Sequence, residues 1–125
     1  MTGLHLSKAI QKILAQAGID NAHAIVAEEN TQQPFAVYRR ATLVVDDTKD
    51  RLLQTQHATL SVQVVSMDYQ SGLQLADSIT DALVGGSGRV NGVTISSITL
   101  SDASEMYNDT SYIQDLTFDI TIENE

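Results

Sequence analysis

The clearest pattern of hydrophobic and polar positions lies in residues 53–84. Within this stretch Ala58, Leu60, Val62 and Val64 occupy alternate positions, and polar residues fill the positions between them. A period of two is typical of a strand that buries one face. The pattern therefore predicts a long strand, around which the other segments of the chain can be arranged.

After Met67 the apolar residues recur at helical spacing, which predicts an amphipathic helix with Ser71 as its N-cap. We expect Gly85 and Gly86 to end this helix, because glycine adopts the left-handed C-cap conformation without steric cost. A strand followed by a helix that lies back over the same sheet predicts a two-layer core. The apolar positions of the helix are Leu75, Ala76, Ile79 and Leu83.

The same two periods predict the elements that precede the long strand. Residues 6–17 have the pattern of an amphipathic helix that ends before Gly18, and residues 23–28 have that of a short strand. Residues 35–45 predict another long strand. The charged segment 46–50 joins it to the long strand that follows, and the two strands form an extended β-hairpin. One face of the strand 35–45 comprises Phe35, Val37, Ala41, Leu43 and Val45, interrupted by Arg39.

The C-terminal part of the chain contains the strongest short-range hairpin signal. Asn91-Gly92 predicts a type I′ turn, because both residues tolerate a positive φ. Residues 93–100 predict a strand with a bulge, since Ile95 is out of phase with the apolar residues that follow it. Residues 101–111 are predicted to be a polar connection to the last strand. The apolar face of that strand comprises Leu116, Phe118, Ile120 and Ile122.

Taken in order, these elements predict an α+β fold: a mostly antiparallel sheet with two helices packed on one face and a long projecting β-hairpin. The length of 125 residues suits a single domain, residues 1–125. We expect the core to lie between the helices and the sheet. Its predicted members are Ile10, Leu14, Leu60, Val62, Ile79, Leu83, Phe118 and Ile120.

The tip of the long hairpin is the predicted contact surface. Apolar residues flank its charged turn, and on a projecting arm they have little of their own chain to pack against. We expect Arg40 to meet carboxylates on a neighbouring strand or subunit. A shorter hairpin folded back on the core, or a mobile loop, agrees equally well with these residues. The predicted subunit or partner interface comprises Arg40, Leu43, Val44, Val45, Asp46, Asp47, Lys49, Asp50, Arg51, Leu52 and Leu53.

Composition and charge narrow the function classes. The chain has 7 basic and 16 acidic residues and a net charge of −9, which argues against tight nucleic-acid binding through clustered cations. There is no cysteine, which excludes disulfides and thiolate chemistry and favours a reducing cytoplasm during folding. We expect no membrane span and no signal peptide. Scattered histidines, no phosphate loop and no nucleophile elbow predict no enzymatic activity, no cofactor and no metal.

The order of elements resembles the tail completion proteins of long-tailed phages and prophages, also called tail terminator or head–tail joining proteins. The resemblance covers nearly the whole chain. After the amphipathic first helix it rests on QQPFAVYRR (32–40), on QHATLSVQVVSMDYQSGLQLADSITDAL (56–83), on the Asn91-Gly92 turn and on YNDTSYIQDLTFDITIE (107–123). It is a similarity in the pattern of elements and includes no catalytic signature.

The resemblance implies a structural virion protein that forms a ring, commonly a hexamer, at the head-proximal end of the tail. Such a ring ends the tail tube, contacts the tail tube protein and the head connector protein, and lets DNA pass through its lumen without specific binding. It would be assembled in the host cytoplasm, away from membranes. A different class remains open, a small-molecule-binding or regulatory α+β module that dimerises through its sheet. A hydrolase is less favoured, because no nucleophile and base pair can be named.

Overall fold

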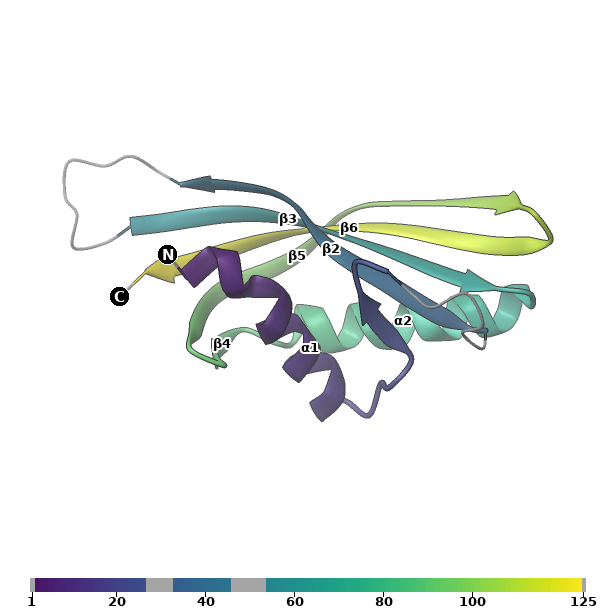
Figure 1. The fold of residues 1–125 in the computed structure, drawn as a ribbon, viewed down its shortest axis with the longest axis horizontal. Coiled ribbons are helices and arrows are strands. Elements are labelled where there is room, and N and C mark those ends of the chain that lie inside the picture. The colour runs from purple at the N-terminus through teal and green to yellow at the C-terminus, as the bar shows by residue number, and fades with distance from the viewer. Residues whose placement is uncertain (1, 27–32, 46–53, 125) are drawn as a thin grey trace.

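The computed structural model describes residues 2–26, 33–45 and 54–124 (Figure 1). A short 3-10 helix, η1 (Thr2–His5), leads into α1 (Leu6–Gln16), and the second long helix is α2 (Tyr69–Val84). The strands are β1 (Ala22–Ala24), β2 (Phe35–Val45), β3 (Gln54–Ser66), β4 (Gly88–Val90), β5 (Val93–Asn108) and β6 (Ser111–Asn124).

The strands form one sheet in the order β1-β2-β3-β6-β5-β4. Among the described strand pairs only β1–β2 is parallel, so the predicted α+β class with a mostly antiparallel sheet is confirmed. Figure 1 shows both helices on the same side of the sheet, which we call the helix face. The other side, the helix-free face, carries no helix in the described part of the chain.

The core lies between the helices and the helix face. Every predicted core residue is buried, and the alternation of Ala58, Leu60, Val62 and Val64 in β3 holds along its length. Leu60 and Phe118 are direct partners across the β3–β6 ladder, and both are 0% exposed. This central pair therefore holds the middle of the sheet against the helices.

The face of β2 differs from the prediction. Ala36 and Tyr38 are buried, whereas Phe35 and Val37 lie half-buried on the helix-free face. The register of β2 against β3 shifts between Arg40 and Thr42, so Ala41 is the extra residue of a bulge. The extra residue reverses the alternation of faces. Val37 and Leu43, which simple alternation places on one face, therefore lie on opposite faces of the sheet. The bulge turns Leu43 to the helix face, where it packs against the core.

The segment 101–111 was predicted to be a polar connection, and this prediction is wrong. It forms the distal half of β5 and the turn into β6, which together make a second long hairpin. β5 continues to Asn108, and Ser111 begins β6 after a tight turn at Asp109 (φ 49°) and Thr110 (φ 67°). Residues 101–110 are exposed throughout, so neither face of this part of β5 requires apolar residues. The expected bulge in the first half of β5 is confirmed, between Ile95 and Ser97.

Local contacts correct the predicted ends of α2. The N-cap is Asp68 and not Ser71: a carboxylate oxygen of Asp68 accepts hydrogen bonds from the Ser71 backbone N–H (3.0 Å) and the Ser71 hydroxyl (2.7 Å). These bonds lower the pKa of the Asp68 carboxyl. The helix ends before Gly85, as expected, but Gly85 has a φ of −87° and is not left-handed. The Asn91-Gly92 turn is confirmed, with φ values of 51° and 82°.

Candidate functional site

The predicted interface is only partly within the described residues. Leu43, Val44 and Val45 lie at the distal end of β2, and Arg40 lies near its middle. Val44 points to the helix-free face and is 58% exposed, whereas Leu43 and Val45 are half-buried. The remaining predicted residues lie outside the described part of the chain: Asp46, Asp47, Lys49, Asp50, Arg51, Leu52 and Leu53.

Arg40 and Leu43 contact the N-terminal segment of their own chain. Arg40 Nη1 donates a hydrogen bond to the Gly3 carbonyl oxygen (3.0 Å), so its described partner is a backbone group and not the expected carboxylate. The Gly3 N–H in turn donates to Oε1 of Gln56 in β3 (2.9 Å), which is buried. Gly3 lies directly over Leu43 and Gln56, and this contact fixes the N-terminal segment on β2 and β3.

A substitution of Gly3 should be costly for this reason. A Cβ atom at Gly3 would overlap the Gln56 side-chain oxygen and lie 2.7 Å from Leu43 Cδ1. We expect Gly3→Ala to lower the free energy of unfolding by about 1 to 3 kcal/mol, as overpacking generally does. Urea denaturation followed by circular dichroism measures the change. Lys8→Ala, at an exposed helical position, is the control, and equal midpoints for both variants would contradict the contact.

Hydroxyl and carboxylate groups predominate over the middle of the helix-free face. Its residues come from alternate positions of the four long strands, and most carry Ser, Thr or acidic side chains. Arg39 and Arg89 are its described basic residues, and they lie on strands near the two edges of the sheet. The described carboxylates of this face are Asp102, Asp115, Asp119 and Glu123. The face therefore presents a polar surface with negative charge at its centre.

A hollow with basic and apolar residues opens beside β2 at the point where β1 ends. It has a volume of about 470 Å³ and is lined by η1, α1, Ile25 and the middle of β2. Three of the seven Lys and Arg residues of the chain line it: Lys8, Arg39 and Arg40. Leu4 and Ile25 supply exposed apolar surface, 57% and 70% exposed. On a chain of net charge −9, this hollow is a local concentration of positive charge.

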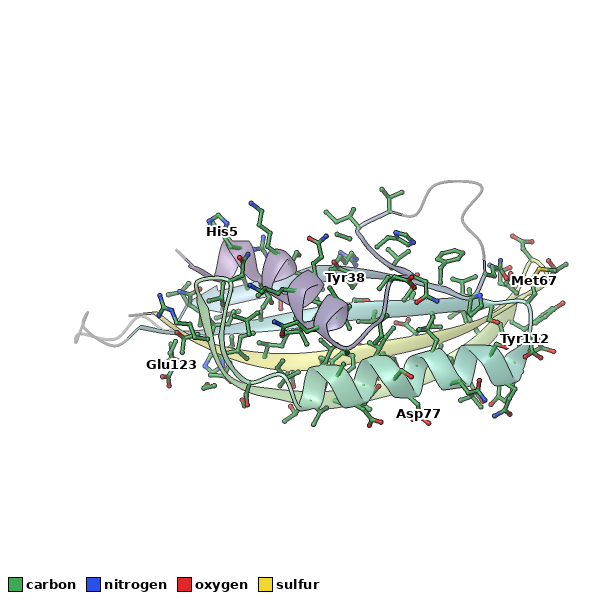
Figure 2. The ribbon with its side chains drawn as sticks, turned by 90° about the horizontal axis from the view of Figure 1, so that it is seen from below. His5, Tyr38, Met67, Asp77, Tyr112 and Glu123 are labelled. Atoms are coloured by element: carbon green, nitrogen blue, oxygen red, sulfur yellow. The ribbon has the colours of Figure 1, made fainter. Side chains whose placement is uncertain are left out.

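The end of the β5–β6 hairpin was not predicted as a site, and it carries a cluster of aromatic residues. The Tyr112 ring meets Tyr69 and Tyr107 edge to face, at centroid distances of 5.5 and 4.9 Å. Figure 2 shows Tyr112 and Met67 at this end of the molecule, far from Glu123. Met67 and Tyr107 are 68% and 61% exposed, so the cluster contributes apolar surface to this end.

Hydrogen bonds to Glu105 attach this hairpin end to α2. Its Oε2 accepts from Gln114 Nε2 (2.9 Å) and from the Tyr69 hydroxyl (2.8 Å). These two bonds lower the pKa of the Glu105 carboxyl, with Gln114 the larger cause, so the group is charged at neutral pH. Because Tyr69 is the first residue of α2, its hydrogen bond joins the hairpin end to the start of the helix.

The described residues lack a metal-binding cluster. They include no group of three or more His, Asp or Glu side chains placed to hold a metal ion. Among the helices of ranges 2–26 and 54–124, none is long and apolar enough to cross a membrane. The features that remain are surfaces: the distal end of β2, the basic hollow, the acidic face and the β5–β6 hairpin.

Comparison with known proteins gives a relation in structure only. No family model matches the sequence, and no curated protein does. The fold is similar to a chain in a solved structure described as the virion of a native gene transfer agent (GTA) particle. The similarity has a TM-score of 0.74, covers 95% of this chain and 95% of that chain, and is accompanied by 16% sequence identity. The two chains share a fold over nearly their full lengths.

Proposed function

We propose that the protein is a non-enzymatic structural subunit of a phage-like virion. The observation that carries this proposal is the similarity in fold to a chain of a gene transfer agent virion, over 95% of both chains. A match over both full lengths relates the whole subunit, not a common sub-motif. The described surface is consistent with it, because it exposes large apolar side chains at several places and includes no cluster of His, Asp or Glu placed to hold a metal ion.

Within the virion, we propose a ring at the head-proximal end of the tail that ends the tail tube and joins it to the head. This assignment rests on the resemblance in element order to tail completion proteins. The neighbours would be the tail tube protein on one side and the head connector protein on the other. The closed ring would be a hexamer, the number common in that family, and its contact arm would be residues 43–53.

The helix-free face is suited to line the lumen of such a ring. DNA carries one negative charge per about 1.7 Å of its axis, and a surface that binds it needs Lys and Arg side chains. The centre of this face instead carries Asp115 and Asp119, surrounded by Ser and Thr hydroxyls. Carboxylates repel the phosphate backbone, so DNA could pass this surface without being retained.

The mass of the native assembly tests the proposal. We expect native mass spectrometry of the purified protein to give a single closed species of several subunits, and electron microscopy to show rings with a central channel. A stable dimer would contradict the ring and favour the regulatory module that dimerises through its sheet. Addition of the protein to tails that lack it should cap their head-proximal end, and uncapped tails would contradict the position.

A further inference from the structure

The two outer edges of the sheet are only partly covered. β1 pairs with β2 from Ala36 to Tyr38, and β4 pairs with β5 from Val93 to Ile95. Beyond these pairs, no described strand lies against β2 from residue 39 to 45 or against the outer side of β5 from residue 96 onward. An open edge presents unpaired N–H and C=O groups, which readily pair with a strand of another chain.

The two open edges lie at the same level of the sheet. The ladder places Arg39, Ser61, Thr117 and Asp102 in one row that crosses the sheet from edge to edge. The next rows join Thr42 to Thr99 and Val44 to Ser97 in the same way. Residues 39–45 and 96–102 are therefore windows of seven residues each at matching height. β2 and β5 run in opposite directions, so a copy placed beside β5 in the same orientation would offer its β2 antiparallel.

The side chains at the two windows are complementary. On the helix-free face, Asp102 at one edge is level with Arg39 at the other edge. Side chains of opposite charge that face each other across two strands stabilise the strand pair. On the helix face, Leu100 is 41% exposed at the β5 edge. It is level with Arg40, which lines the hollow that contains the exposed Leu4 and Ile25. The β5 edge thus carries an acidic and an apolar side chain, and the β2 edge carries a basic side chain and an apolar hollow level with them.

We propose that the β5 edge of one copy pairs antiparallel with the β2 edge of the next copy and makes the sheet continuous around the ring. Asp102 meets the neighbour's Arg39, and Leu100 enters the neighbour's hollow. Bulges at Ser96, Ser101 and Ala41 bend both edges, so regular pairing is confined to Ser97–Thr99 against Thr42–Val44.

A second copy is the occupant because both complementary surfaces belong to this chain. Two different edges in contact make a head-to-tail interface, which closes into a ring when the rotation between copies permits it. An isologous dimer through β5 alone would leave Arg39 and the basic hollow outside the contact. The inference rests on the proposed ring and names the contact that would build it.

Engineered cysteines test the contact directly, since the natural chain contains none. Directly opposed residues of antiparallel strands have Cα atoms about 4.5 to 5.5 Å apart, within the range of a disulfide. We expect a mixture of Thr42→Cys and Thr99→Cys proteins to form a disulfide-linked dimer on oxidation, and each variant alone to form none. The double variant should give a ladder that stops at the mass of the closed ring. Asp77→Cys, on the outward side of α2 in Figure 2, is the control that should not join the ladder.

The outcomes separate the contact from the ring. Native rings without a Thr42–Thr99 crosslink would overturn the edge pairing and leave the ring intact. A crosslinked ladder that continues without a limit would support the pairing and contradict the closed ring. Absence of both crosslinks and rings would overturn both proposals.

Charge exchange provides a second test. Arg39→Asp should abolish the ring species in native mass spectra, because it places a second carboxylate opposite Asp102 of the neighbouring copy. Arg39→Asp combined with Asp102→Arg should restore that species, and Asp77→Arg should leave it unchanged. Failure of the double variant to recover, with a wild-type melting temperature, would overturn the assigned pairing of Arg39 with Asp102.

Discussion

Replacing Phe118 with alanine should lower the free energy of unfolding by about 3 to 5 kcal/mol. Phe118 is 0% exposed and lies at the centre of β6, between the β3 and β5 strands. Its direct partners are Leu60 and Leu100, so truncation leaves a cavity that the paired strands cannot close without breaking their ladder. The cost combines the lost burial of the ring with the residual cavity.

Leu60→Ala should cost about 2 to 5 kcal/mol for the same reason, since Leu60 occupies the facing position of β3. Asp119→Asn is the matched control. Asp119 is the chain neighbour of Phe118 but is exposed on the other face, so its change should remain within about 0.5 kcal/mol. Chemical denaturation of the three variants measures the differences. Unfolding of Phe118→Ala at the parent midpoint would refute the assigned faces of β6.

Sequence periodicity was sufficient wherever an element buries one complete face. β3, β6, α1 and α2 all meet the core along most of their length, so their apolar spacing reports their structure directly. The Asn91-Gly92 turn was equally predictable, because its backbone conformation restricts the residues that can form it. These signals are local, and each depends only on neighbours within the same segment.

The same periodicity carried no information where both faces of a strand are exposed. The distal part of β5 has polar residues on both sides, and its strand conformation depends on pairing with β6. The face of β2 was misassigned because the bulge at Ala41 depends on the register against β3. The Asp68 cap was missed by a shift of three residues, since both Asp and Ser are common N-caps.

The candidate contact surfaces show the same division. The distal end of β2 was predicted as a contact from its apolar residues alone, and that assignment stays a prediction. The β5 edge could not, because Asp102 and Leu100 acquire significance only when four strands bring them level with Arg39 and Arg40. A row that crosses a sheet is a long-range property, and no spacing within one segment of the sequence reports it.

The contact arm, residues 43–53, leads to the prediction with the largest effect on assembly. Replacing residues 46–53 by Asn-Gly should leave the melting temperature of the subunit unchanged and abolish tail completion. Val45 pairs with Gln56, so the replacement leaves a four-residue connection of Asn, Gly, Gln54 and Thr55, a length common in hairpins. The segment removed contains Leu52 and Leu53 and five charged residues: Asp46, Asp47, Lys49, Asp50 and Arg51.

The reason to expect a loss is that buried apolar surface contributes roughly 25 cal/mol per Å², which Leu52 and Leu53 would gain by contact with a partner. The charges beside them would select the correct partner. Unimpaired tail completion by the variant would refute the arm as a contact. If tail completion is lost, the Thr42–Thr99 crosslink identifies the partner of the arm, because both engineered cysteines lie outside the replaced segment. If the crosslinked ring persists while tails remain incomplete, the arm contacts the tail tube or connector protein. If the ring is lost as well, the arm contacts the neighbouring subunit.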